Sequence, residues 1–164
     1  MKDYKIASPT TISYRYFELA LQNRKSPAQP LAAECFRVCE AWGVNPAVAL
    51  AFFVHESNCG TRGAAVKTKN WGNLRSGPGA IRIADTGVSG GFGVYASWVV
   101  SLNDFCRLLR GQVYEGMELK TVRQVLPRYA PSGDNNNPTA YADFVNSQVS
   151  LWQRMSFGTE GGGT

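Results

Sequence analysis

Metal-binding side chains are scarce in this 164-residue sequence. It has one histidine, His55, and four cysteines, with no CxxC pair among them. A structural zinc site normally needs four such ligands in closely spaced pairs, so we expect no metal and no other cofactor. We expect Cys35, Cys39, Cys59 and Cys106 to be free, buried thiols, although three pairings into disulfides are formally open.

Long apolar runs and dense basic runs are also lacking. No stretch approaches the roughly 20 apolar residues of a membrane-spanning helix, and the first ten residues, MKDYKIASPT, contain no signal-peptide h-region. The net charge is +5, but lysine and arginine are dispersed rather than gathered into a nucleic-acid-binding stripe. We therefore expect no membrane insertion and no nucleic-acid partner. The charge favours a diffuse attraction to a polyanionic matrix.

The sequence does contain enough apolar material for one core. Its composition, 44% hydrophobic and 18% charged, is typical of a globular protein. Residues 1–157 are expected to form a single domain, and the glycine-rich residues 158–164 a flexible tail.

Apolar residues recur mostly at helical spacing, which predicts a mainly α-helical protein. A small β-hairpin lobe is expected at 76–95, where glycine is frequent and one short stretch alternates. A capping box marks the helix beginning after Thr121, and Asn137 followed by Pro138 suits the start of the last helix. The expected helices are 11–23, 31–42, a buried helix beginning at Pro46, 96–110, and those beginning near 121 and 138.

Glu56 is the leading catalytic candidate. It lies in the last turn of the expected helix that begins at Pro46, which is apolar on every side and should be stopped by Gly60 and Gly63. No cation is among its neighbours on that helix. Desolvation and the negative end of the helix dipole should therefore raise its pKa, as a general acid requires. The alternative is a glutamate that reaches solvent or pairs with a distant arginine.

The segment 68–75, TKNWGNLR, combines amides, an indole and a guanidinium. Amides can bond sugar hydroxyl and acetamido groups, and an aromatic ring can stack on a pyranose face. The segment therefore predicts a saccharide site. The alternative is a polar loop that inserts its tryptophan into the core.

Asp85 is the only acidic residue between Glu56 and Asp104. It could supply the second carboxylate of a glycosidase. Its Asp-Thr-Gly context is equally typical of a turn.

Four segments, in order over roughly residues 26–155, resemble the bacterial and phage endo-β-N-acetylglucosaminidases of the lysozyme-like superfamily. They are PAVALAFFVHESNCGTRGAA at 46–65, KTKNWGNLR at 67–75, GFGVYASW at 91–98 and RYAPSGDNNNPTAYADFV at 128–145. The resemblance implies a lysozyme-like helical fold with a cleft between the main body and the β lobe. It also implies hydrolysis of the β-1,4 glycan backbone of peptidoglycan by a monomer that acts at the bacterial cell wall. Phage-type release, a tail-associated form or a mature secreted form would fit that location.

The resemblance also assigns roles to residues. It makes Glu56 the general acid and Tyr129 a tyrosine beside the scissile sugar, with Asp85 as the candidate second carboxylate. The residues it places in contact with substrate are Asn70, Trp71, Asn73, Tyr95, Asp134 and Asn136. If Asp85 does not reach the cleft, the substrate's acetamido group or Tyr129 would have to assist. A muramidase, a lytic transglycosylase and a non-catalytic wall-binding module remain as alternatives.

Overall fold

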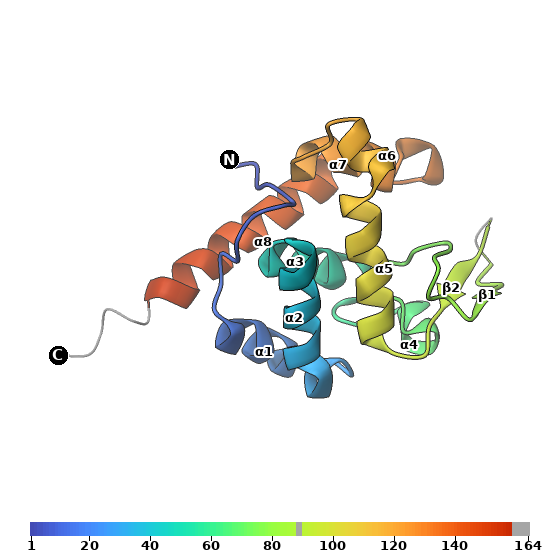
Figure 1. Cartoon of the computed structure of the whole chain (residues 1–164), viewed down its shortest axis with the longest axis horizontal. Coiled ribbons are helices and arrows are strands. Elements are labelled where there is room, and N and C mark those ends of the chain that lie inside the picture. Colours follow the sequence, from blue (N-terminus) through green and yellow to red (C-terminus); the bar gives the residue numbers. More distant parts are fainter. Residues whose placement is uncertain (88–89, 159–164) are drawn as a thin grey trace.

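The structure, a computed structural model, describes residues 1–87 and 90–158. It is mainly helical with one small antiparallel sheet, which confirms the predicted mainly-α class (Figure 1). The α-helices are α1 (Tyr14–Asn23), α2 (Ala32–Trp42), α3 (Pro46–Ser57), α4 (Ala65–Thr68), α5 (Trp98–Arg110), α6 (Gln112–Gly116), α7 (Val122–Tyr129) and α8 (Pro138–Gly158). Two short 3-10 turns, η1 (Gln29–Leu31) and η2 (Ser132–Asp134), complete the helical elements.

The buried helix α3 is the centre of the fold. Its start is as predicted: Pro46 occupies the first turn, and the Asn45 side chain accepts a hydrogen bond from the backbone N–H of Ala47. Its end differs from the prediction, because Asn58 adopts the left-handed conformation (φ 47°) ahead of Gly60. Asparagine tolerates this conformation and can act as a helix C-cap. Glu56 therefore lies one residue before the last residue of the helix.

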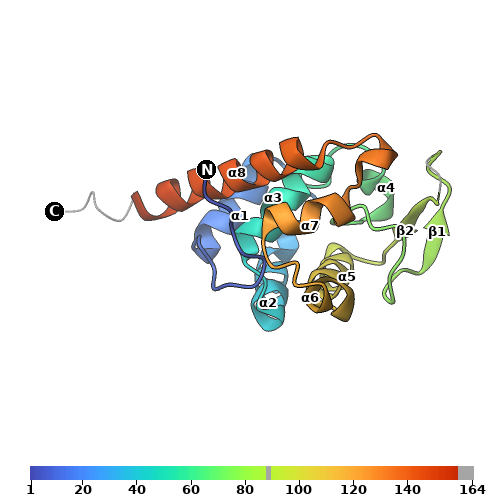
Figure 2. The same ribbon diagram turned by 90° about the horizontal axis from the view of Figure 1, so that it is seen from above.

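Helices pack around α3 on several sides. The long helix α8 runs along it, α1 and α2 cover a second side, and α7 rests on α8 (Figures 1 and 2). The sequence predicted a helix ending before residue 158, but α8 continues to Gly158. The rest of the predicted tail, 159–164, lies outside the described residues.

The segment before α1 is an unpredicted part of the core. Tyr4 and Ile6 are buried, and short bridges pair Lys5 with Thr121 and Ala7 with Val44. The Tyr4 backbone N–H donates to the Asn146 side chain, which ties the N-terminal segment to α8. Tyr4 and Ile6 alternate with the polar residues Asp3 and Lys5, but this alternation is too short to predict a strand, and tertiary contacts order the segment.

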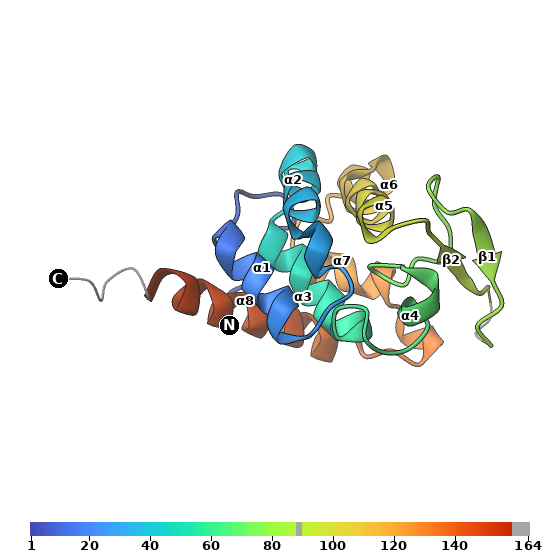
Figure 3. The same ribbon diagram turned by 90° about the horizontal axis from the view of Figure 1, so that it is seen from below.

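The β lobe is a hairpin of β1 (Arg82–Ala84) and β2 (Phe92–Val94), inside the predicted range 76–95. Ile83 is opposite Gly93 in the antiparallel register. The backbone N–H of Gly93 also donates to the carbonyl oxygen of Leu74, at 2.9 Å. This bond joins the hairpin to the loop after α4, at the end of the molecule opposite the C-terminal end of α8 (Figure 3).

The four cysteines, Cys35, Cys39, Cys59 and Cys106, are free and buried, as predicted. Burial raises the pKa of the Cys59 thiol to about 12, and it raises the pKa of Cys35 as well. A protonated thiol without solvent access reacts slowly with disulfide reagents.

We predict that the native protein reacts negligibly with a disulfide reagent at pH 8 and that four thiols react after guanidinium unfolding. Spectrophotometric thiol counting provides the measurement. Rapid labelling of even one thiol in the native protein would contradict the burial of these residues.

Candidate active site

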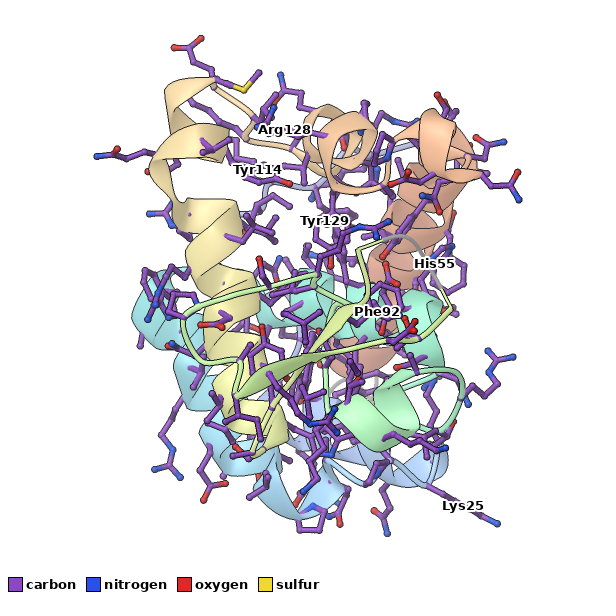
Figure 4. All side chains as sticks on the ribbon, turned by 90° about the vertical axis from the view of Figure 1, so that its right-hand side faces the viewer. Lys25, His55, Phe92, Tyr114, Arg128 and Tyr129 are labelled. Atoms are coloured by element: carbon purple, nitrogen blue, oxygen red, sulfur yellow. The ribbon has the colours of Figure 1, made fainter. Side chains whose placement is uncertain are left out.

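Glu56 lies at the wall of a pocket of about 390 Å³. The pocket is between the helical body and the loop that carries the β lobe. Helices α5, α6 and α7 form one wall, and the segment 72–75 with β2 forms the other (Figure 4). The lining residues are Glu56, Gly72, Asn73, Leu74, Arg75, Phe92, Leu108, Tyr114, Arg128, Tyr129, Ala130, Pro131, Asp134 and Asn136.

Two neutral donors hold the Glu56 carboxyl group. Tyr141 Oη, from the first turns of α8, donates to Oε1 at 2.6 Å, and Asn73 Nδ2 donates to Oε2 at 3.0 Å. The Asn73 amide also lies 3.3 Å from the Glu56 carbonyl oxygen. Asn73 itself has a left-handed backbone (φ 51°), which aims its side chain back toward the end of α3. Two segments distant in the sequence thus fix the orientation of a carboxyl group carried by α3.

The environment favours the neutral form of Glu56. Burial raises its pKa, and the hydrogen bonds from Tyr141 and Asn73 offset this only in part. In the described part of the chain no ion pair involves Glu56. The alternative in which an arginine clamps this carboxylate is therefore wrong for this structure.

Asn73 can serve both protonation states of Glu56. Its Oδ1 atom is buried and has no hydrogen-bond partner among the described residues. A carboxamide has donors on one side and an acceptor on the other. Its Nδ2 donates to the carboxylate in this structure. If the amide group rotates by half a turn, its Oδ1 can instead accept a hydrogen bond from the protonated acid. Asn73 lines the pocket as well as bonding Glu56, and its predicted contact with sugar stays a prediction.

Tyr141 is a site residue that was not among those predicted from the sequence. The His55 ring stacks on the Tyr141 ring with centroids 3.5 Å apart, which holds the tyrosine over the end of α3. Burial and the nearby Glu56 raise the pKa of Tyr141, so its hydroxyl remains a donor. The sequence feature that could have identified Tyr141 is its position within the segment 128–145, RYAPSGDNNNPTAYADFV, one of the four that carry the resemblance.

Tyr129 lines the pocket, as expected for a residue beside the sugar. Its hydroxyl donates a short hydrogen bond to the carbonyl oxygen of Gly72, and its ring meets Phe52 edge-on. Burial raises the pKa of Tyr129 well above its usual value. It is therefore a neutral donor already bonded to the opposite wall, and its catalytic role stays a prediction.

Three of the predicted substrate contacts are structural residues. Trp71 is fully buried, and its Nε1 donates to the Ala49 carbonyl oxygen at 2.9 Å. Asn70, also fully buried, uses its amide to bind backbone groups of Leu74 and Gly93. These predictions are wrong because both side chains face the core. Tyr95 is only 2% exposed and is also absent from the pocket wall.

Of the two predicted aspartates, Asp134 lines the pocket and Asp85 does not. Asp85 is exposed, accepts a hydrogen bond from the backbone N–H of Gly87, and is not among the residues that line the pocket. It has the turn geometry that was the alternative to a catalytic role. Asp134 and Asn136 do line the pocket, and Asp134 forms an ion pair of 3.3 Å with Arg75 across its mouth.

Comparisons with family models, with curated proteins and with solved structures gave no match. Within residues 1–87 and 90–158, no group of three or more metal-ligand side chains is arranged to hold an ion. Over the same ranges, no helix is both long and apolar enough to cross a membrane.

Proposed function

We propose that this protein is a glycoside hydrolase that cleaves the β-1,4 glycan backbone of peptidoglycan, acting as an endo-β-N-acetylglucosaminidase. One observation carries the proposal: a carboxyl group with a raised pKa lies at the wall of an open pocket, held by neutral donors. A neutral acid beside a pocket of this size is the group needed to protonate a glycosidic oxygen. The four-segment resemblance supplies the substrate class.

In this mechanism Glu56 transfers its proton to the leaving oxygen as the C1–O bond breaks. Tyr141 and Asn73 then stabilise the resulting carboxylate through the bonds described above. Asp134, the other carboxylate of the pocket, is paired with Arg75. The arrangement therefore favours a route in which the substrate's 2-acetamido oxygen attacks C1. Water then opens that intermediate and leaves a reducing sugar.

A lytic transglycosylase is the second candidate, and the pairing of Asp134 favours it as well. There the 6-hydroxyl of muramic acid attacks its own C1, so the second step consumes no water and needs no second carboxylate. The products distinguish the reactions. Mass spectrometry of a peptidoglycan digest should show new reducing N-acetylglucosamine ends for our proposal. Reducing muramic acid would indicate a muramidase, and 1,6-anhydro ends a transglycosylase.

A non-catalytic wall-binding module would retain the pocket but release nothing. Its discriminating result is sedimentation of the protein with purified walls without any soluble fragment. A pure binder has no need for a buried glutamate with a raised pKa at its pocket wall, so the environment of Glu56 favours the enzyme.

The pH dependence of wall lysis should report the state of Glu56. Because the acid form is the active one, the rate should fall as pH rises through the pKa of Glu56. In Tyr141→Phe, the carboxylate loses a donor, so this pKa and the falling limb should move to higher pH. Carbon-detected NMR of the glutamate carboxyl groups can follow the same shift without substrate.

Tyr14→Phe is the matched control for this experiment. Tyr14 also donates to a glutamate, Glu18, but at the exposed face of α1. The Tyr14→Phe variant should leave the falling limb of the pH–rate curve where it is in the wild type. A falling limb that stays fixed or moves to lower pH in Tyr141→Phe would contradict the assignment.

A further inference from the structure

Arg128 is a pocket residue whose charge is not compensated. It lies in the last turn of α7, beside Tyr129, and its side chain lines the pocket. No ion pair joins it to a carboxylate in the part of the chain that the structure describes. Its guanidinium carbon is 6.0 Å from the centroid of the Tyr114 ring, which supports it from the α6 side (Figure 4). The guanidinium is thus directed to the pocket by an aromatic contact rather than held by an acid.

The other charged groups of the pocket balance each other. Arg75 and Asp134 form an ion pair, and burial favours the neutral form of Glu56. Among the described residues that line the pocket, Arg128 is therefore the cation that no carboxylate pairs. Arg128 is exposed, and a cation at a pocket wall without a carboxylate partner among the described residues favours a ligand that brings an anion to it.

We propose that Arg128 binds a carboxylate of the saccharide that occupies this pocket. This inference rests on the proposed function and deepens it, because it makes Arg128 a specificity-determining residue for acidic over neutral glycans. A planar guanidinium can bond both oxygens of a carboxylate at once. In peptidoglycan that carboxylate belongs either to the lactyl ether of muramic acid or to the attached peptide. Chitin has the same β-1,4-linked backbone of N-acetylated sugars and carries neither group.

The test compares ligands of equal backbone length on a protein that cannot consume them. Calorimetry on Glu56→Gln would measure three dissociation constants: for a peptide-free tetrasaccharide of alternating N-acetylglucosamine and N-acetylmuramic acid, for its peptide-bearing form, and for chitotetraose. We expect the acidic ligands to bind about ten-fold more tightly than chitotetraose. If the peptide-free form shows the preference, the lactyl group is the source. If only the peptide-bearing form shows it, the peptide is the source.

A second variant assigns that preference to Arg128. Adding Arg128→Met to Glu56→Gln should bring the acidic-to-neutral affinity ratio close to one. Arg154→Met is the matched control, because it removes the same charge from an exposed position in the distal half of α8 that is not among the residues lining the pocket. It should leave the ratio unchanged, and circular dichroism would verify that each variant is folded.

Two results would overturn the inference about Arg128 without contradicting the proposed function. One is equal affinity of Glu56→Gln for acidic and neutral tetrasaccharides, and the other is a preference that survives Arg128→Met. If Glu56→Gln binds none of the three saccharides, the proposed function fails too. The experiment therefore separates an error about Arg128 from an error about the site.

Discussion

Replacing Glu56 with glutamine should reduce lysis of purified cell walls by about a hundred- to ten-thousand-fold, which is the usual contribution of a general acid. Glutamine has the same shape but no transferable proton. The fold should survive the change, because the side-chain carbonyl oxygen of the introduced glutamine can still accept from Tyr141 Oη. Its amide can donate to Asn73 Oδ1, which lacks a partner among the described residues. Turbidity loss of a wall suspension gives the rate, and thermal unfolding gives the stability.

Glu40→Gln is the control for this variant. Glu40 is also a helical glutamate, but it is exposed on α2 and does not line the pocket. The control should lyse walls at the wild-type rate. If Glu56→Gln lyses walls as fast as this control, the proposed mechanism is wrong.

The sequence predicted the position of Glu56 because strong local signals define its helix. Residues 46–54 are apolar on every side, and Asn45 with Pro46 marks the start of the helix. An all-round apolar helix must be buried, so an ionisable group in its last turn must be partly desolvated. The capping box at Thr121 and Gln124 was equally readable, because both of its hydrogen bonds are local.

The sequence did not predict which polar residues of the loop after α4 face the pocket. Asn70 and Asn73 are three residues apart, with similar neighbours, yet one binds the β lobe and the other binds Glu56. The left-handed backbone at Lys69 and Asn73 sets these directions. Loop conformation of this kind depends on tertiary contacts, and composition alone carries no information about it. The contribution of Tyr141 depends in the same way on how α8 packs against α3.

Trp71 shows how the same residue type can have opposite roles, because an aromatic ring stacks equally well on a sugar or in a core. Its ring lies against Phe53 with centroids 3.9 Å apart and an interplanar angle of 22°, and none of it is exposed. The indole N–H also satisfies a backbone carbonyl oxygen of α3. The Trp71 side chain therefore stabilises the folded state, which raises the free energy of unfolding.

Trp71→Ala should accordingly destabilise the protein by about 3–5 kcal/mol, as large cavities in a core do, and should lower the melting temperature by about 10 °C. Trp71→Phe should lose less, since a ring remains to stack on Phe53. Trp42→Ala is the control, because Trp42 is only partly buried and its indole bonds the Asn103 side chain near the surface. Chemical denaturation with fluorescence would give the three values. A tryptophan that contacted sugar instead would give the reverse pattern: Trp71→Ala as stable as the wild type, with its glycan affinity lost.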